Sequence, residues 1–382
     1  MNFSLKDQKK SIWQMVLYLF VNVLFILKYV GRTDIPAYLV AIIYAIIFVG
    51  FVYLYYKFAS KISQNVYRIT SIILLGILIL AISLALVNID PYSVRVDRWS
   101  AVSFFLDALF NGQYPYGAHT HVSDTNFPSP FPVWHFINVG FYLLGDVGIG
   151  LIFFLILVFV FIQFYFDSYR KTFYFFALLA LSPAYWWEVA VRSDSLSNAF
   201  LVLIFIIWYA KKKYSVDKNF LLTVVFCGLI ASTRLSAIIP VALFLFGSYI
   251  RTSWIKKIIF PLAILGLVFL TFLPFILWNV DGELIFFSRN PFMSQTSVGN
   301  PVILTLMIIA GMLFALKWKN TNEYFGYTAS FIFLFILTSQ LGLMLNDQSS
   351  ESFFTNSIYD VSYFTLYLPY SIMYLTTKVK DA

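Results

Sequence analysis

Long apolar runs separated by polar segments recur along the chain from one end to the other. Most runs approach the roughly 17–25 residues that span about 30 Å of hydrocarbon as an α-helix. Helices are the expected form, because a bilayer core offers no water to backbone N–H and C=O groups. The pattern predicts an all-α polytopic membrane protein with about twelve transmembrane helices. The expected spans are 12–30, 35–56, 70–88, 149–166, 172–187, 194–210, 217–232, 236–250, 257–278, 301–317, 324–344 and 359–376.

The longest polar interruption, residues 89–148, has structure of its own. Its segment WSAVSFFLDALF carries apolar residues at helical spacing, which predicts an amphipathic juxtamembrane helix at the membrane surface. The moderately apolar stretch 130–145 is expected to be interfacial or re-entrant, because a full crossing would invert every later loop. Loops with interfacial structure are where function concentrates on a helical scaffold.

The spans group into three parts with different expected roles. Residues 1–69 hold two accessory transmembrane helices, of which the first is expected to be retained and not cleaved as a signal peptide. Residues 70–278 form the expected core with its outer loop. Residues 279–382 add further transmembrane helices with outer loops at 279–300 and 345–358. No internal repeat and no Gly-rich phosphate loop occur in the sequence.

Composition and charge support a membrane protein. Hydrophobic residues make up 60% of the chain and charged residues only 12%, far from the usual balance of a soluble domain. The net charge of +8 reflects topology and not a nucleic-acid partner, because most basic residues fall in loops on one predicted side. The positive-inside rule makes that side, and both termini, cytoplasmic. Those residues are Lys6, Lys9, Lys10, Lys57, Lys61, Arg68, Arg170, Lys171, Lys211, Lys212, Lys213, Lys218, Arg251, Lys256, Lys257, Lys317, Lys319, Lys378 and Lys380.

Metal and cofactor chemistry have little support in the sequence. The single cysteine, Cys227, excludes a disulfide framework and a multi-cysteine metal site. His119 and His121 flank a threonine, with Asp124 nearby, but two histidines at this spacing in a polar loop are a weak metal signal. No metal and no cofactor is expected.

The basic residues on the predicted outer face are mostly arginines. A planar guanidinium with five donors holds phosphate better than a lysine does, so this bias indicates an anionic ligand outside. The alternative is that these arginines pair locally with acids and extend to the interface. The outward basic residues are Lys28, Arg32, Arg95, Arg98, Arg192, Arg234 and Arg289.

Asp97 and Arg98 follow the outer end of a predicted helix. A carboxylate there can act as a general base toward an acceptor hydroxyl if it lies within hydrogen-bond reach. The alternative is a loop acid paired with Arg95 or Arg98. Asp90 is expected to cap the helix exit together with the proline that follows it.

A second polar island, residues 182–200, lies between two apolar runs. Ionisable groups at the membrane boundary are costly unless they pair or bind something. Arg192 is a candidate for holding a phosphate, with Asp194 or Glu188 orienting it or the acceptor. The alternative is an ion pair that caps the next helix, since Ser193 and Asp194 favour helix N-termini.

Three further residues complete the candidate site. Arg234 stands between two apolar runs, so a ligand phosphate or a buried carboxylate is its expected partner. Arg289 begins a plausible outer turn, where a surface role is the default. His135 is expected to orient the interfacial helix or to line the pocket.

The segments DRWSAV, LFNGQYPY and NFPSPFPVWHFINVGFYLLGD together resemble the first extracytoplasmic loop of GT-C membrane glycosyltransferases. The likeness is to the polyprenyl-phosphate-sugar-dependent branch, which includes protein O-mannosyltransferases and lipid A aminoarabinose transferases. The matching parts are Asp97, Trp99 to Phe110, Gly112 to Tyr116, Pro128 to Pro132 and Leu144 with Gly145. SPAYWWEVAVRSDSLSNAF and STRLSAIIPVALFLFG resemble a downstream helix pair of that family, so the likeness covers about residues 70–250.

The resemblance implies an enzyme of the plasma (inner) membrane with its active site on the extracytoplasmic face. A sugar on a polyprenyl phosphate would pass to a glycan, lipid or protein acceptor. Asp97 would be the general base, and arginines such as Arg192 and Arg234 would steady the leaving phosphate. Arg98 stands where many relatives carry a second acid, which weakens the case for a metal and for a conventional base.

Two other functions fit the same features less well. A lipid-linked sugar or polysaccharide transporter or flippase would carry ionisable residues at mid-membrane in two corresponding halves, whereas here they gather at the outer boundary. A polysaccharide polymerase or ligase would be expected to carry its large loop later in the chain. Both stay open as alternatives to the glycosyltransferase.

Overall fold

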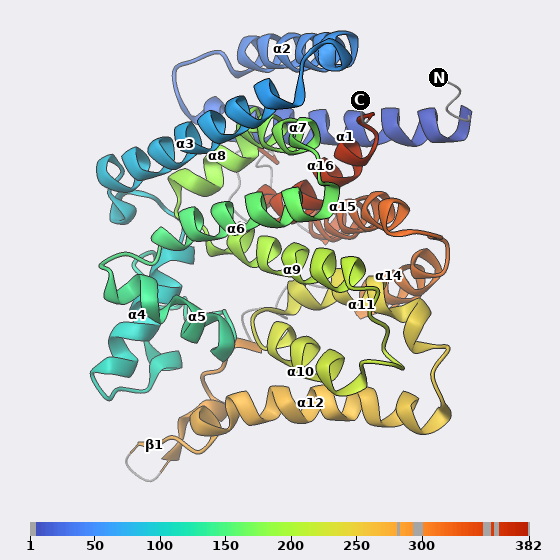
Figure 1. The fold of residues 1–382 in the computed structure, drawn as a ribbon. Coiled ribbons are helices and arrows are strands. Elements are labelled where there is room, and N and C mark those ends of the chain that lie inside the picture. Colours follow the sequence, from blue (N-terminus) through green and yellow to red (C-terminus); the bar gives the residue numbers. More distant parts are fainter. Residues whose placement is uncertain (1–4, 281–282, 293–300, 347–352, 355–358, 381–382) are drawn as a thin grey trace. The chain divides into compact units, whose positions relative to one another are not determined.

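The computed structural model describes residues 5–280, 283–292, 301–346, 353–354 and 359–380, and these are mainly helical (Figure 1). Within these ranges the strands are β1 (Asn279–Val280) and β2 (Glu283–Leu284), which pair antiparallel with Asn279 opposite Leu284. The prediction of an all-α chain is confirmed.

Among the described residues, seven helices are long and apolar enough to cross a membrane. This confirms the membrane-protein class, whereas the count of twelve stays a prediction. The seven are Lys9–Arg32, Ala37–Lys61, Gln64–Asn88, Ile149–Phe166, Asp194–Lys211, Trp254–Ile276 and Thr321–Met344, and shorter apolar helices are Phe220–Ala231, Leu235–Tyr249 and Thr305–Ala315.

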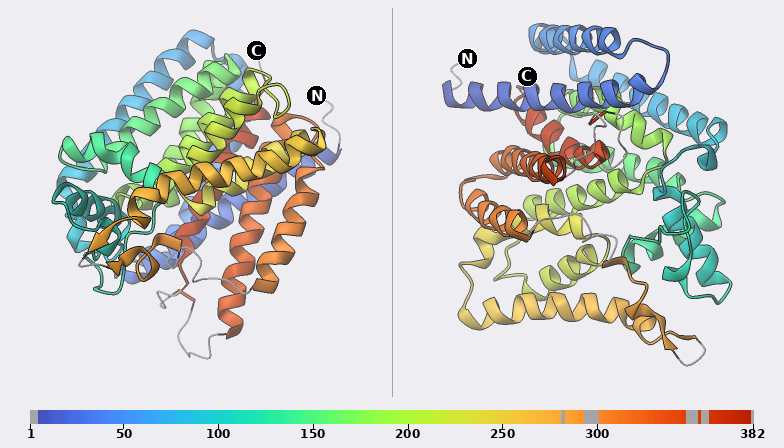
Figure 2. Two further views of the ribbon diagram at one scale, coloured as in Figure 1. Left: turned by 90° about the horizontal axis from the view of Figure 1, so that it is seen from below. Right: turned by 180° about the vertical axis from the view of Figure 1, so that it is seen from behind.

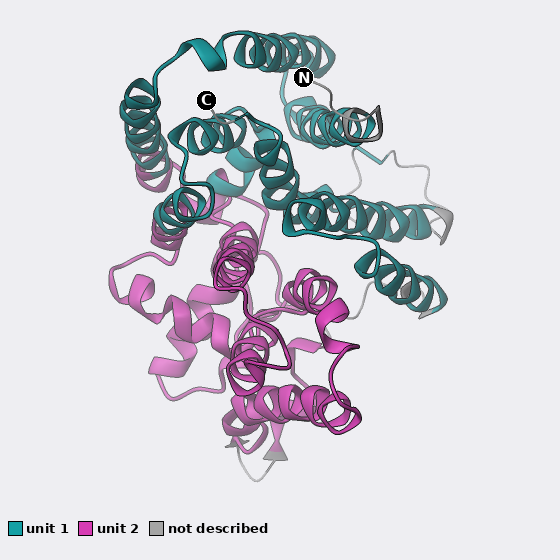
Figure 3. Ribbon diagram, turned by 45° about the vertical axis from the view of Figure 1, so that its right-hand side comes forward, with its two compact units in different colours: residues 1–82, 156–189, 300–382 teal, residues 83–155, 190–299 magenta. Residues whose placement is uncertain are grey.

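The chain divides into two compact units, which are coloured separately in Figure 3. Unit 1 contains residues 1–82, 156–189 and 300–382, and unit 2 contains residues 83–155 and 190–299. The predicted division at 69/70 and 278/279 concerns expected roles and stays a prediction.

Unit 1 is a bundle around α16, which contacts α1, α7 and α15. Gly326 on α15 permits a close approach, because a Cβ there would lie 2.7 Å from a ring carbon of Tyr374 on α16. Helices and turns that lie wholly in this unit are α1 (Leu5–Tyr29), η1 (Val30–Arg32), α2 (Ala37–Phe58), η2 (Ala59–Lys61), α7 (Tyr169–Ala180), α14 (Pro301–Ala315), α15 (Thr321–Asn346), η6 (Val361–Tyr367) and α16 (Leu368–Thr377). Figure 2 gives two further views of these helices.

The predicted span 172–187 is interrupted in the structure. It consists of α7 and the start of α8 (Pro183–Ala190), with a break at Leu181 and Ser182. Proline cannot donate an N–H to a preceding turn, so Pro183 starts a new helix instead of continuing α7. The predicted span 359–376 is likewise divided into η6 and α16.

Unit 2 contains a series of short helices that follow α3 (Gln64–Asn88), whose last residues belong to this unit. Its long helices α9 and α12 are joined by α10 and α11, and α4 contacts both α5 and α9. The elements are η3 (Pro91–Ser93), α4 (Arg98–Phe110), η4 (Pro115–Gly117), α5 (Pro132–Leu143), the start of α6 (Ile149–Phe166), α9 (Asp194–Lys211), α10 (Phe220–Ala231), α11 (Leu235–Tyr249), α12 (Trp254–Ile276) and η5 (Ile285–Phe287).

The two predicted helices of the first loop are present. α4 covers the segment predicted as an amphipathic helix, and α5 lies within the stretch 130–145. α5 has 12 residues, and at about 1.5 Å per residue it is too short for a hydrocarbon layer of about 30 Å. Its start is fixed by backbone bonds from Phe131 and Val133 to the carbonyls of Thr233 (2.9 Å) and Ser232 (3.0 Å) at the end of α10.

Candidate functional site

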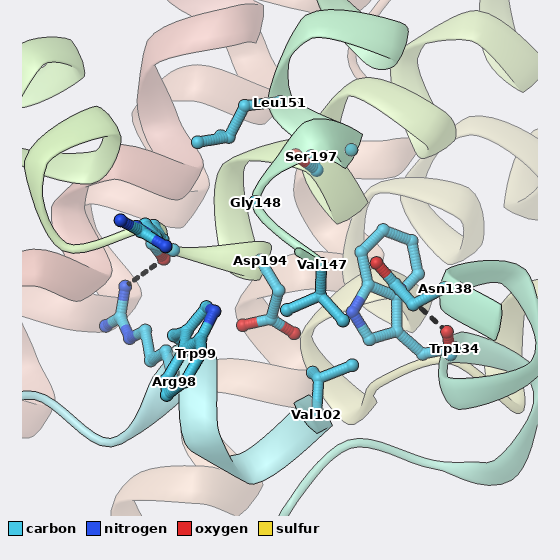
Figure 4. Close-up of a pocket in the computed structure, with 13 residues that line it drawn as sticks. Arg98, Trp99, Val102, Trp134, Asn138, Val147, Gly148, Leu151, Asp194 and Ser197 are labelled. Atoms are coloured by element: carbon cyan, nitrogen blue, oxygen red, sulfur yellow. Dashed lines mark hydrogen bonds between the residues drawn. The ribbon is translucent and has the colours of Figure 1, made fainter. Parts of the chain in front are cut away.

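A small cavity in unit 2 brings together three of the residues singled out from the sequence. Arg98 from α4, Arg192 from the turn before α9 and Asp194 from the first turn of α9 line it (Figure 4). Trp134 and Asn138 contribute from α5. The cavity has a volume of about 10 Å³, which is room for about one water molecule.

Arg192 joins three parts of unit 2 through its guanidinium. Its Nη1 pairs with the Asp146 carboxylate, and its Nη2 donates to the carbonyls of Leu86 (2.6 Å) and Ile89 (2.7 Å) at the end of α3. Its backbone has φ of 49°, a left-handed conformation that costs a residue with a Cβ about 1–3 kcal/mol. The surrounding bonds must therefore hold this turn in place.

Asp146 is a centre of this network that the sequence reasoning did not single out. One of its carboxylate oxygens accepts from Trp99 Nε1 (3.0 Å) and from the backbone of Gly148 (2.7 Å), and the other meets Arg192. Position 148 has little room for any residue larger than glycine, because a Cβ there would come within 2.7 Å of the Leu86 side chain. The sequence does carry a signal for this residue, because Asp146 is the only acid between Asp124 and Asp167.

Arg234 pairs with Asp194. Its Nε donates to Asp194 Oδ2 at 3.0 Å, and its Nη2 contacts the same oxygen. Of the two partners predicted for Arg234, the buried carboxylate is therefore present. Within the described ranges Asp194 Oδ1 and Trp134 Nε1 have no hydrogen-bond partner, so the cavity is bordered by a free acceptor and a free donor.

Ser193, which directly precedes Asp194, connects Arg98 to the Arg234–Asp194 ion pair. Its hydroxyl oxygen accepts from Arg98 Nη1 (2.9 Å) and from the backbone of Ser195 (3.3 Å). The second bond caps α9, which is the N-terminal role expected for this serine. The same side chain thus starts α9 and orients an arginine of α4.

Asp97 lies at the start of α4, directly before Arg98, and its side chain is half-buried. It does not line the cavity and does not cap α4 with its side chain. Its carboxylate instead accepts a bond from Asn126 Nδ2 at 3.3 Å, in the loop that precedes α5. Asp97 is therefore partly exposed, and it directly precedes the buried Arg98.

His121 links the loop that precedes α5 to α4 and to the segment before α4. Its Nδ1 lies 2.6 Å from Ser100 Oγ, and its Nε2 lies 2.9 Å from the carbonyl oxygen of Val94. Because both ring nitrogens are already engaged, His121 is not disposed to bind a metal. Among the described residues, no group of three His, Cys, Asp or Glu side chains is placed to hold a metal ion.

Arg289 lies on the surface after η5, over part of the first loop. Its guanidinium carbon is 5.2 Å from the ring centre of Phe127, and its carbonyl accepts from Tyr114 at 2.9 Å. Phe127 follows Asn126, which donates to Asp97, so Arg289 contacts the loop that holds the candidate base. Glu188 is fully buried in α8 and belongs to unit 1.

His135 is fully buried in α5, where its ring stacks on Phe105 with centroids 3.5 Å apart. Its Nε2 lies 3.1 Å from the carbonyl of Pro130. Burial holds the pKa of this imidazole well below its usual range, and the charge of Arg234 lowers the pKa further, against the opposing effect of the Pro130 carbonyl. His135 is therefore a neutral packing residue that orients α5, one of its two predicted roles.

The buried His135 is expected to make unit 2 sensitive to acid. Below pH about 6.5 the unfolded chain takes up a proton that the folded imidazole refuses, so stability falls by up to about 1.4 kcal/mol per pH unit. Thermal unfolding in detergent at pH 7.5 and 5.5 measures this, and His135→Gln should lose less stability between the two than wild type. His119→Gln, at an exposed histidine, is the control. An equal loss in wild type and His135→Gln would contradict the assignment.

Comparison with known proteins adds no relative to this picture. No protein-family model matches the chain, and no curated protein and no solved structure matches it.

Proposed function

We propose that the protein is a membrane glycosyltransferase that transfers a sugar from a polyprenyl phosphate to an acceptor on the extracytoplasmic face. The supporting observation is the grouping in unit 2. Arg98, Arg192 and Asp194 line one cavity, Arg234 pairs with Asp194, and the half-buried Asp97 directly precedes Arg98. A GT-C enzyme needs an accessible acid next to guanidinium groups at the membrane surface.

In the proposed reaction Asp97 accepts the proton of an acceptor hydroxyl. The acceptor oxygen then forms a bond to the anomeric carbon, while the bond from that carbon to the phosphate oxygen breaks. The polyprenyl phosphate leaves with the electron pair and stays in the bilayer. Positioned cationic donors stabilise the charge that develops on the phosphate.

The hydrogen bonds divide the arginines into two roles. Both terminal nitrogens of Arg192 are engaged by Asp146 and the end of α3, and Arg234 is engaged by Asp194. We assign these two to positioning. Arg98 is buried, donates to Ser193 Oγ at 2.9 Å and lines the cavity, so it is a positioning residue as well. We assign the phosphate to the exposed Arg95, two residues before Asp97.

The volume of the cavity limits where the donor binds. A space of about 10 Å³ admits a water molecule and excludes a sugar. The proposal therefore places the sugar on the outer side of α4, where Asp97, Asn126 and the exposed Arg95 lie. The cavity network then serves as the rigid support behind that surface.

The test is release of free polyprenyl phosphate by the full-length protein in lipid nanodiscs. A panel of polyprenyl-phosphate sugars is offered as donors, with a membrane extract as the source of acceptor. Release from one donor, dependent on the extract, is the expected result. Movement of the lipid-linked sugar between leaflets without release would instead identify a transporter, and the enzyme proposal would be abandoned.

The orientation is part of the proposal: twelve crossings, both termini in the cytoplasm and unit 2's first loop outside. It predicts opposite labelling of two exposed positions in a Cys227→Ser background. An impermeant maleimide added to intact cells should label Asp124→Cys and not Lys212→Cys, and permeabilised cells should show both. Labelling of Lys212→Cys in intact cells would invert the topology.

A further inference from the structure

A second, larger cavity lies within unit 1, among α1, α14, α15 and α16. Its volume is about 250 Å³, far more than the roughly 10–15 Å³ that one water molecule requires. Its lining is mainly apolar and includes Trp13, Phe314, Leu334 and Tyr374. An apolar space of this size is suited to a hydrocarbon chain and not to ordered water.

The cavity borders exposed apolar side chains of unit 1, which a membrane-spanning unit would present to lipid. Trp13 is 49% exposed and Leu334 is 37% exposed, and both line the cavity. Val16 and Phe20 continue the exposed apolar face of α1. Tryptophan at the end of a transmembrane helix favours the level of the lipid headgroups, so a lipid can reach this cavity from the side.

Opposite charges lie at the polar end of the cavity. Lys10 Nζ is 3.8 Å from Glu323 Oε1 and 3.4 Å from the hydroxyl of Tyr327. Glu323 Oε2 accepts from the backbone of Lys319 at 3.0 Å, which orients the other oxygen toward Lys10.

The Lys10–Glu323 pair is loose. Its separation exceeds the about 2.7–2.9 Å of a charge-assisted hydrogen bond, and the two side chains are 30% and 26% exposed. Each charge therefore retains the capacity to bind a group of opposite sign, and both charges lie at the edge of one apolar space.

We propose that unit 1 binds one phospholipid with a primary ammonium in its headgroup. An acyl chain fills the cavity, the phosphate meets Lys10, and the ammonium donates to Glu323 Oε1. A choline headgroup has no N–H to donate, and the carboxylate repels an anionic headgroup that lacks an ammonium. The proposal uses no residue of unit 2 and is independent of the proposed glycosyl transfer.

Lipid retention by the full-length protein tests the proposal. The protein is reconstituted in bilayers with equal parts of phosphatidylethanolamine, phosphatidylcholine and phosphatidylglycerol, extracted gently, and examined by native mass spectrometry. One retained phosphatidylethanolamine is expected. Glu323→Gln should reduce its preference over phosphatidylcholine about tenfold, the effect of losing one hydrogen bond to a charged group.

Three further variants separate the headgroup from the chain. Lys10→Met should weaken retention of all three lipids, and Leu334→Trp, which adds bulk at the exposed edge, should displace the chain. Lys9→Met removes the same charge from the adjacent exposed position, which does not line the cavity, and should change nothing. Equal retention of the three lipids by wild type, preference for phosphatidylglycerol, or an unchanged preference in Glu323→Gln would overturn the proposal.

Discussion

Replacement of Asp97 by asparagine is expected to lower sugar transfer about 100- to 10,000-fold, the usual contribution of a general base. The amide cannot accept the acceptor's proton, yet it has nearly the volume of the carboxylate and keeps an oxygen that can accept from Asn126. Unfolding temperature and detergent extraction should therefore stay close to wild type. The measurement is initial rate of polyprenyl phosphate release in nanodiscs.

Asp90→Asn is the matched control for this experiment. Asp90 lies in the same loop, where its carboxylate caps η3 by accepting from the backbone of Tyr92 at 3.0 Å. The proposed reaction does not use it, so its variant should retain near-normal transfer. Normal turnover in Asp97→Asn, or equal losses in both variants, would remove Asp97 from the role of base.

Replacement of Arg234 by methionine should produce the largest loss of stability, about 3–5 kcal/mol. Both partners of the Arg234–Asp194 pair are largely buried, with side chains 11% and 8% exposed. Removing the guanidinium leaves a carboxylate uncompensated in a site that water barely reaches. The unfolding temperature in detergent should fall accordingly.

The double variant Arg234→Met with Asp194→Leu distinguishes this cause from loss of packing. It removes the stranded charge, so it should be more stable than Arg234→Met alone, because apolar residues often replace a buried ion pair without loss. Lys256→Met breaks the exposed pair with Asp217 and should have little effect. A double variant as unstable as Arg234→Met would show that the loss has another origin.

The sequence predicted the helical class and α4 because both follow from local patterns of apolar residues. It did not predict the break before Pro183, because mean hydropathy carries an apolar run across a single proline. The candidate arginines were found because they lie in polar segments at the ends of apolar runs, whereas their partners were found only in part. Asp146 is 46 residues from Arg192 along the chain, and only the fold brings such distant charges together.

His121 illustrates a second limit. A histidine in a polar loop is compatible with several roles, and the contacts of His121 with Ser100 and Val94 depend on how the loop returns to α4. The role of His135 was easier to anticipate, since aromatic residues surround it in the sequence as they do in the structure.

The distance along the sequence between Asp146 and Arg192 also has a consequence during protein synthesis. At about 5–20 residues per second, the 46 residues between them take roughly 2–9 s to synthesise. During that interval the carboxylate has no arginine, and inserting it alone into the hydrocarbon layer would be costly. The newly made α5 segment is therefore expected to wait in the aqueous boundary of the membrane, and to dock only when the turn bearing Arg192 has left the ribosome.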